Sequence, residues 1–414
     1  MNELKVASSH SVFFWNMMGS LCNAASSVIL LMAVTRISGA EVAGLFSIAF
    51  AIAQLLLTIG LFEVRPYQST DIIDRFSFSQ YYTFRVLTCI IMMFFAIIYV
   101  LIGQYDFYKS SVIILISFYK MFDALTDVFH GLFQQKNHLE LAGKSLAFRV
   151  IISTIVFCLG LYLLKNLIIA TIAAIIISII WYILYDLQVV KYFSKRTFVF
   201  DWVRLFKIAT ECFPLFAGSF MMMYILNSPK YAIDIYLPIE MQTYYNIIFM
   251  PASVVNLFSL FIFRPMLTTM AEDWNQKNYK AFKKLVIKLL GCIIVLTICV
   301  LIVAYFAGIP VLSYLYGVNL HAYHLELLIV LLGGGVSAMT TFLYYAITVM
   351  RKQYYLLIGY GLSFIVAIIL SIKLVKMLGI LGGALSYVIV MNILLFSFLV
   401  IFVINYRNNC SIIE

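Results

Sequence analysis

Residues 110–149 read SSVIILISFYKMFDALTDVFHGLFQQKNHLELAGKSLAFR, a stretch that is apolar enough to cross a bilayer and yet contains full charges. On an α-helix, five of its polar side chains fall within an arc of about 80° and form a stripe about 21 Å long. These side chains are Lys120, Asp123, Asp127, His130 and Gln134. A charge that faces hydrocarbon costs at least ~2.5–3.5 kcal/mol. The stripe is therefore predicted to face a polar, water-containing cavity, while the apolar opposite side faces lipid or other helices.

The composition of the whole chain supports a membrane location. Of the 414 residues, 64% are hydrophobic and only 11% are charged, and the mean hydropathy is +1.03. These values exclude an ordinary soluble domain. Spans of about 20 residues leave room for roughly twelve helices and for no sizeable soluble domain. The expected fold is an all-α polytopic membrane protein.

Apolar runs predict where the membrane spans lie. They are expected near residues 12–35, 42–63, 80–102, 111–133, 145–164, 166–188, 208–227, 239–263, 285–308, 325–349, 354–375 and 380–404.

A weak internal repeat suggests that these spans form two halves. The runs TRISGAEVAGLFSIAFAIA and SPKYAIDIYLPIEMQTYYNIIFMPA each contain a basic residue, a short turn, a glutamate (Glu41 or Glu240) and an apolar helix. Two parallel repeats are a common way to build a transporter. We therefore expect two six-helix lobes, residues 1–200 and 201–414.

The distribution of charge predicts the orientation in the membrane. The net charge is +10, but the basic residues are scattered between apolar runs and form no nucleic-acid-binding domain. With a cytoplasmic N-terminus, about 20 Lys and Arg residues fall inside and about 6 outside, which favours both termini in the cytoplasm. The basic, aromatic loops around residues 190–207 and 266–284 are expected to contact membrane phospholipid.

Within the stripe, spacing predicts how the charges pair. Lys120 can pair with Asp123 at i+3, and Asp127 follows Asp123 at i+4. This leaves one negative charge unpaired and makes Asp127 the candidate for protonation or cation binding. The alternative is a closed, purely structural salt bridge. His130 is interpreted as a polar residue on the helix face, with a proton relay as the alternative.

Arg85 and Arg149 admit two interpretations. Each lies near a predicted span end, from which a long side chain can reach the lipid headgroups. If both point inward, they join Lys120 in a cationic wall suited to phosphate, which arginine binds through two parallel hydrogen bonds.

Charges near the other span ends are interpreted as surface groups. Arg36, Lys230 and Asp234 are expected to be interfacial anchors, and the alternative is a rim that contacts the sugar or phosphate part of a substrate. Glu63 and Arg65 are predicted to form a local ion pair at the inner face.

The sequence carries no motif of an enzyme. It has no nucleophile–base arrangement, no nucleotide-binding motif and no metal-ligand spacing, and its seven cysteines show no C-x-x-C pattern. We therefore predict no catalytic residue, no metal site, no cofactor and no disulfide framework.

Four runs together resemble a known family: TRISGAEVAGLFSIAFAIAQLL, GLFEVRPYQSTD, DALTDVFHGLFQQKNHLELAGKSLAFRVIIS and SPKYAIDIYLPIEMQTYYNIIFMPASVV. They are similar to the polysaccharide-export flippases, the Wzx-type branch of the multidrug/oligosaccharidyl-lipid/polysaccharide exporter superfamily. The resemblance implies two rocking lobes that move an undecaprenyl-diphosphate-linked oligosaccharide across the bacterial cytoplasmic membrane, for lipopolysaccharide O-antigen, capsule or teichoic acid.

The same resemblance leaves partners and alternatives open. A proton or sodium gradient and a polysaccharide polymerase are the partners it suggests. A cation-coupled multidrug antiporter of the related branch is the alternative transporter. A membrane polysaccharide polymerase is the alternative enzyme, but such enzymes need a large outside loop, and the longest outside segment here, around residues 308–325, is short.

Overall fold

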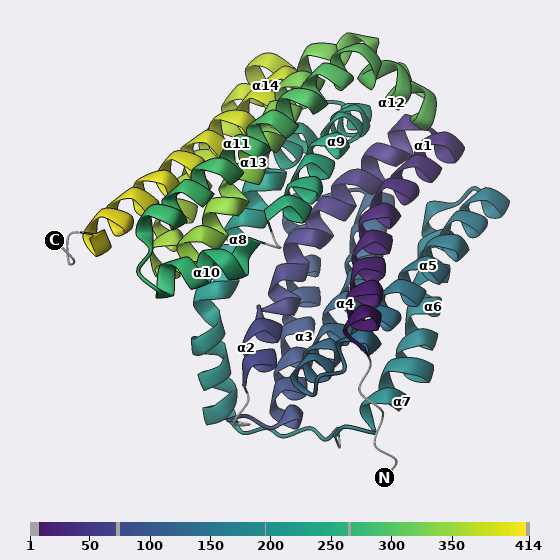
Figure 1. The fold of residues 1–414 in the computed structure, drawn as a ribbon. Coiled ribbons are helices and arrows are strands. Elements are labelled where there is room, and N and C mark those ends of the chain that lie inside the picture. The colour runs from purple at the N-terminus through teal and green to yellow at the C-terminus, as the bar shows by residue number, and fades with distance from the viewer. Residues whose placement is uncertain (1–7, 72–74, 195, 264–265, 411–414) are drawn as a thin grey trace. The chain divides into compact units, whose positions relative to one another are not determined.

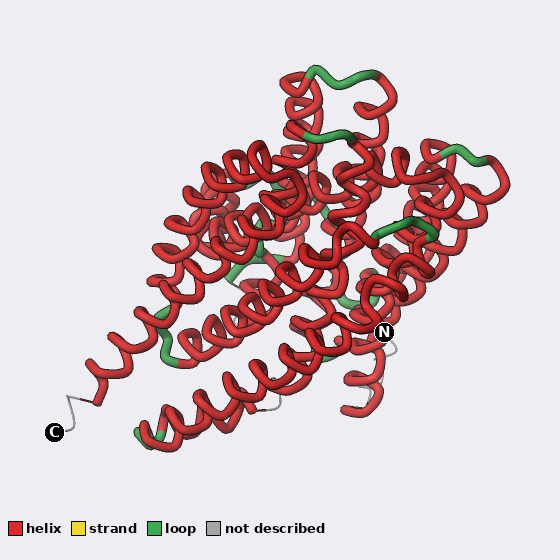
Figure 2. The backbone as a smooth tube through the Cα atoms, turned by 90° about the horizontal axis from the view of Figure 1, so that it is seen from above, coloured by secondary structure: helices red, strands yellow, loops and turns green. Residues whose placement is uncertain are grey.

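The structure, a computed structural model, describes residues 8–71, 75–194, 196–263 and 266–410. Throughout these residues the regular elements are helices joined by loops (Figure 2). Three basic residues counted above as facing the cytoplasm, Lys5, Lys195 and Arg264, lie outside the described residues.

The chain divides into two compact units, residues 1–220 and 221–414, and the division falls inside helix α8. The sequence-based division lies before this helix. Unit 1 contains α1 (Ser9–Leu61), α2 (Val64–Thr70), α3 (Phe78–Gly103), α4 (Phe107–Gln135), α5 (Leu139–Leu164), α6 (Leu167–Trp181), α7 (Leu187–Val190) and the first part of α8 (Trp202–Tyr236). Unit 2 contains the rest of α8, α9 (Ile239–Phe263), α10 (Leu267–Asn275), α11 (Tyr279–Val303), α12 (Ile309–Tyr316), α13 (His324–Val349) and α14 (Leu356–Cys410).

Two glycines divide the longest helices. Gly39 in α1 has φ 86° and ψ 174°, and Gly379 in α14 has φ 61° and ψ −135°. Residues with a Cβ rarely adopt such backbone angles. Figure 1 shows α1 running from the N-terminal end to a turn and back toward α2. The turn expected after the first span is therefore a kink at Gly39.

These kinks reconcile the helices with the predicted spans. Eight helical stretches in the described residues are long and apolar enough to cross a membrane. Two of them, His10–Thr70 and Gln353–Asn409, contain the glycine kinks. The helices α4 and α9, of 29 and 25 residues, are also long enough to cross. The expected count of about 12 spanning helices is thus roughly confirmed.

Helix α4 lies at the centre of unit 1, where α1, α2, α3, α5 and α6 pack around it. Asp106 caps its N-terminus by accepting hydrogen bonds from the backbone N–H groups of Tyr108 and Lys109. Phe129 and Phe133, on its apolar side, are fully buried. Because α4 is enclosed by helices, its apolar side is used for packing inside the unit.

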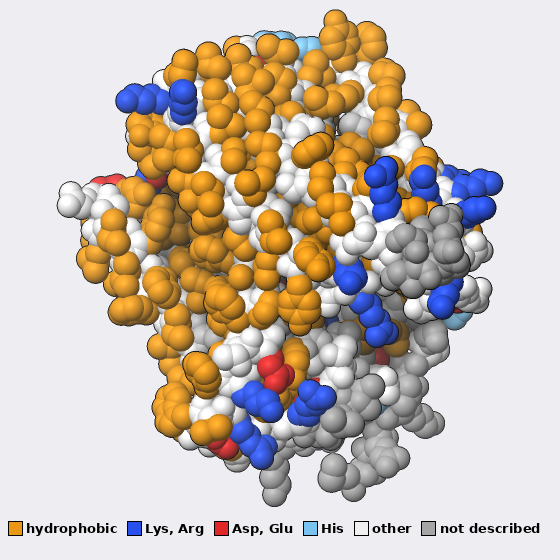
Figure 3. Space-filling view, turned by 90° about the vertical axis from the view of Figure 1, so that its left-hand side faces the viewer, with side chains coloured by type: hydrophobic (Ala, Val, Ile, Leu, Met, Phe, Trp, Pro, Cys, Tyr) orange, Lys and Arg blue, Asp and Glu red, His pale blue; other side chains and the backbone are white. Residues whose placement is uncertain are grey.

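The outer surface carries the apolar side chains expected of a protein in lipid. Figure 3 shows one face on which hydrophobic side chains predominate and Lys and Arg gather toward one side and the bottom of the view. Ile102, Leu163 and Phe306 are among the large hydrophobic residues that are mostly exposed. Helices satisfy their own backbone hydrogen bonds, which is what a hydrocarbon environment demands. The chain is a multi-pass membrane protein.

Candidate functional site

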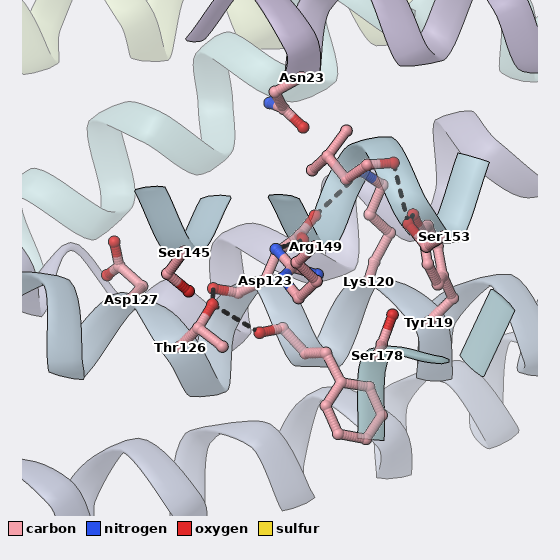
Figure 4. A network of polar contacts seen from close by, with 12 residues as sticks. Asn23, Tyr119, Lys120, Asp123, Thr126, Asp127, Ser145, Arg149, Ser153 and Ser178 are labelled. Carbon is pink, nitrogen blue, oxygen red and sulfur yellow. Dashed lines mark hydrogen bonds and ion pairs between the residues drawn. The ribbon is translucent and has the colours of Figure 1, made fainter. Parts of the chain in front are cut away.

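The first part of the candidate site is an ion-pair cluster around Asp123. Lys120 Nζ lies 2.9 Å from Asp123 Oδ2, and Arg149 Nη2 lies 2.5 Å from Asp123 Oδ1. Arg149 comes from α5 and has no exposed surface, whereas 17% of the Asp123 side chain is exposed. Figure 4 shows these three side chains close together, with Asp127 further along α4. The predicted pairing of Lys120 with Asp123 is confirmed, and Arg149 points inward.

The second part surrounds Asp127, one helical turn away. Arg85 Nη2 lies 2.8 Å from Asp127 Oδ2, and Arg65 Nη1 lies 3.3 Å from Asp127 Oδ1. Arg85 comes from α3 and is fully buried, and its Nη1 atom also donates a 2.6 Å hydrogen bond to the Gly60 carbonyl. Asp127 is therefore not the unpaired charge that the sequence suggested, because helix α3 and the chain after α1 each supply an arginine.

The turn after α1 brings Arg65 to the site. Phe62 and Glu63 adopt left-handed backbone angles, with φ 42° and 49°, and this ends α1 and starts α2. Helix α2 then packs on α4, where Gln68 donates a hydrogen bond to the Val128 carbonyl. The predicted ion pair between Glu63 and Arg65 is wrong. Glu63 instead accepts a 2.6 Å hydrogen bond from Ser219, and Arg65 binds Asp127 and Gln134.

The two clusters together carry an excess of positive charge. Two carboxylates, those of Asp123 and Asp127, form ion pairs with four basic side chains: Lys120, Arg149, Arg65 and Arg85. Among the described residues, Nε and Nη1 of Arg149 and Nε of Arg85 are buried and have no hydrogen-bond partner. A guanidinium group carries five N–H donors. Both buried arginines therefore retain donors that an incoming anion can use.

His130 lies on α4 with Lys120, Asp123 and Asp127. Its side chain is buried on α4, and its Nε2 atom has no partner among the described residues. Helix α4 thus carries Lys120, Asp123, Asp127 and His130 along one side, as the helical spacing predicts.

The remaining predicted residues lie elsewhere. Arg36 is exposed on α1 beside the Gly39 kink. Lys230 and Asp234 belong to α8 in unit 2, and the Lys230 Nζ atom lies 4.8 Å from the centre of the Phe249 ring. None of these three residues takes part in the ion pairs around Asp123 and Asp127.

Sequence reasoning missed the buried carboxylates of unit 1, Asp71, Glu140 and Asp186, of which Asp186 is the most deeply buried. Asp186 is fully buried, and its Oδ1 atom accepts a 2.6 Å hydrogen bond from Ser145. Its Oδ2 atom has no partner among the described residues. The signal for it was an acidic residue inside the apolar run at residues 166–188. In the part of the chain that the structure describes, no group of three or more His, Cys, Asp or Glu side chains could hold a metal ion.

Sequence comparison identifies a relative of almost the same extent. No family model matches the chain. The chain is 24% identical over 394 residues to the capsular polysaccharide biosynthesis protein CapF of Staphylococcus aureus, which covers 94% of this chain and 96% of that protein. This similarity confirms the resemblance to polysaccharide exporters.

Structural comparison gives the fold. The lipid II flippase MurJ, in an inward closed conformation, matches with a TM-score of 0.73 at 15% identity, over 95% of this chain and 90% of that one. An inward-facing multidrug resistance MATE family transporter of the MOP superfamily matches with a TM-score of 0.67 at 13% identity, over 98% and 99%. The chain therefore has the membrane-transporter fold that MurJ and the MATE transporters share, and it resembles the polysaccharide exporters of that superfamily.

Proposed function

We propose that this protein is a flippase that moves an undecaprenyl-diphosphate-linked oligosaccharide across the bacterial cytoplasmic membrane for the assembly of a surface polysaccharide. The cluster formed by Arg65, Arg85, Lys120 and Arg149 binds the diphosphate. This function requires no cofactor and no catalytic residue.

The observation that carries the proposal is the excess of basic side chains in the ion pairs around Asp123 and Asp127. Arg85 and Arg149 are fully buried, and four basic side chains share two carboxylates. Charge inside a membrane protein is expensive and is a functional hypothesis by default. A diphosphate carries the negative charge that the cluster lacks, and arginine forms strong hydrogen bonds with phosphate oxygens.

The rest of the substrate suits the rest of the molecule. A polyprenyl tail is apolar and can stay in the lipid around the exposed hydrophobic surface. The CapF protein is described as acting in capsular polysaccharide biosynthesis, and MurJ as a lipid II flippase. Both descriptions support a lipid-linked glycan as the substrate of this chain. The proposed orientation places both termini in the cytoplasm, in accordance with the excess of Lys and Arg in the inside loops.

Flipping of a fluorescent undecaprenyl-diphospho-N-acetylglucosamine in proteoliposomes tests the proposal. Arg65→Gln is the first variant, because 30% of the Arg65 side chain is exposed and Asp127 keeps Arg85 as a partner. Loss of a charge-assisted hydrogen bond, about 1.5–3 kcal/mol, predicts at least about a tenfold weaker affinity for the lipid. Lys120→Met is the second variant and should act in the same direction.

The matched control is Arg204→Gln, since Arg204 forms a 3.5 Å ion pair with Asp201 on the exposed start of α8. This variant should flip the lipid as the native protein does. Unchanged flipping in both Arg65→Gln and Lys120→Met would remove the cluster from the mechanism. No flipping by the native protein would reject the function itself.

A second candidate is a cation-coupled multidrug antiporter, which the likeness to a MATE transporter favours. The charge of the cluster argues against it, because four cations and two carboxylates repel a cationic drug. Efflux of ethidium from vesicles without movement of the lipid would decide for the antiporter.

A further inference from the structure

Helix α11 in unit 2 carries three lysines on one side of its first part. At 3.6 residues per turn, Lys280, Lys284 and Lys288 fall within an arc of about 80° and extend over about 12 Å of the helix axis. All three side chains are exposed. The sequence of the helix, Tyr279–Val303, contains no acidic residue. The first part of α11 therefore presents a basic surface.

These lysines have no acidic partner in the part of the chain that the structure describes. None of the three forms an ion pair there. Glu272 and Asp273, the carboxylates of the preceding helix α10, form no ion pair with them either. A surface with charges of one sign attracts ions of the opposite sign. The three ammonium groups are thus available to an anionic partner.

The same side of α11 continues as an exposed apolar surface. Ile287, Val295 and Ile298 are 59%, 61% and 50% exposed. Gly291 lies between them on this side, and the space where its Cβ would point is open. Half of a hydrocarbon core of ~30 Å is about 15 Å, which equals ten helical residues and thus the rise from Lys288 to Ile298. The lysines and the apolar residues together form one amphipathic surface, which matches a single leaflet in length.

Aromatic side chains at the start of α11 indicate the level of the lipid headgroups. Trp274 of α10 packs on Tyr279, with 4.8 Å between the ring centres, and the Tyr406 hydroxyl of α14 donates a 3.1 Å hydrogen bond to the Tyr279 carbonyl. Tryptophan and tyrosine are enriched where a membrane meets water. Lysine side chains further along the helix reach that level by extending toward it. The charges of this surface therefore lie among headgroups and its apolar residues in hydrocarbon.

We propose that this surface of α11 binds an anionic glycerophospholipid. The three lysines contact the phosphate and the anionic headgroup, and the acyl chains lie along the apolar side chains of residues 287–298. A free phosphate ion or an acidic peptide would leave these apolar side chains uncovered, whereas a phospholipid covers both parts. Lysine is a point charge that suits a phosphodiester, in contrast to the forked arginines of unit 1. The site belongs to unit 2 alone and does not depend on the proposed function.

Binding of two labelled phospholipids by the purified full chain in detergent micelles tests the site. Phosphatidylglycerol and phosphatidylcholine, each with a pyrene on one acyl chain, are titrated, and energy transfer from tryptophan gives both dissociation constants. A lysine near anionic headgroups contributes about a fivefold gain in affinity, so the native protein should prefer phosphatidylglycerol at least about tenfold. The double variant Lys280→Gln with Lys284→Gln should lower this preference at least about fivefold and leave the affinity for phosphatidylcholine unchanged.

The matched control is Lys373→Gln with Lys376→Gln, which removes the same charge from two exposed positions on α14. This variant should keep the preference for phosphatidylglycerol. An equal loss in the control would mean that only the net charge of the protein matters, and it would overturn the site. Should the α11 double variant melt at a lower temperature than the native protein, Lys288→Gln alone gives the same readout, with a preference at least about threefold lower.

Two competing ligands identify the occupant. Glycerol 3-phosphate should not displace the labelled phosphatidylglycerol, because it has no acyl chain, and displacement would make the surface a site for phosphate ions instead. Farnesyl diphosphate should compete less well than unlabelled phosphatidylglycerol, and stronger competition would make the occupant a polyprenyl diphosphate. Equal affinities of the native protein for the two labelled phospholipids, or an unchanged preference in the folded α11 variants, would also overturn the proposal. The flipping measurements on Arg65→Gln test the proposed function separately.

Discussion

Arg149 on α5 places its Nη2 atom 2.5 Å from the Oδ1 atom of Asp123 on α4, and the arginine side chain has no exposed surface. Two helices are thereby joined through a charge pair inside a membrane unit. A buried charge that loses its partner is left without compensation in a medium of low dielectric constant. The pair therefore contributes to the packing of unit 1 as well as to the charge of the site.

Replacing Arg149 by Met should lower the free energy of unfolding by about 3–5 kcal/mol, because Asp123 keeps only Lys120. Thermal unfolding in detergent measures the loss. The double variant Arg149→Met with Asp123→Leu should recover part of the stability, since no unpaired carboxylate remains. Arg204→Gln, which breaks an exposed ion pair, should change stability by no more than about 1 kcal/mol. A loss in Arg149→Met as small as that of the control would contradict the structural role.

Arg85→Lys should destabilise unit 1 even though the charge is kept. Arg85 binds two groups at once, the Asp127 carboxylate and the Gly60 carbonyl. An ammonium group lacks the planar fork that reaches both. The expected loss is about 1.5–3 kcal/mol, the contribution of one charge-assisted hydrogen bond. Arg85→Met should cost more, because Asp127 would retain only the longer contact to Arg65, and equal melting temperatures for the two variants would refute this reasoning.

Gly39→Ala should destabilise the protein by about 1–3 kcal/mol, because φ 86° and ψ 174° are backbone angles that only glycine adopts readily. Open space surrounds Gly39, so the effect comes from the backbone and not from a clash. Gly291→Ala provides the control, since Gly291 lies within α11 and an added methyl group also meets open space. That change should stabilise the helix by about 0.5–1 kcal/mol. The melting temperature is expected to fall in Gly39→Ala and to rise in Gly291→Ala. A change in the same direction in both variants would contradict a glycine-dependent kink at residue 39.

Cysteine labelling along α4 should report which side of the helix meets water. In a variant without the native cysteines, Gln134→Cys should react readily with a water-soluble maleimide, because Gln134 is exposed. Phe129→Cys should remain protected, because Phe129 is fully buried. Asp127→Cys, at a position whose side chain is 16% exposed, should react at an intermediate rate. Uniform labelling of the three positions would mean that α4 is not enclosed by its neighbouring helices.

The sequence alone determined the approximate positions of the membrane-spanning helices, because each span is a local property of an apolar run. The ninth helix begins and ends at the predicted residues, Ile239 and Phe263. The sequence also determined that Lys120, Asp123 and Asp127 share one side of a helix, since helical periodicity depends only on spacing. The i+3 pairing of Lys120 with Asp123 follows from the same local geometry.

Only the tertiary structure decided which distant residues meet these charges. Arg85 and Arg149 could reach the lipid headgroups or turn inward, and nothing in their own helices distinguishes the two. The packing of α3 and α5 on α4 turns them toward Asp127 and Asp123. Arg65 reaches Asp127 because two consecutive left-handed residues redirect the chain, a feature that helical spacing does not encode. Ion pairs between helices depend on which faces pack together, and that is settled by the fold as a whole.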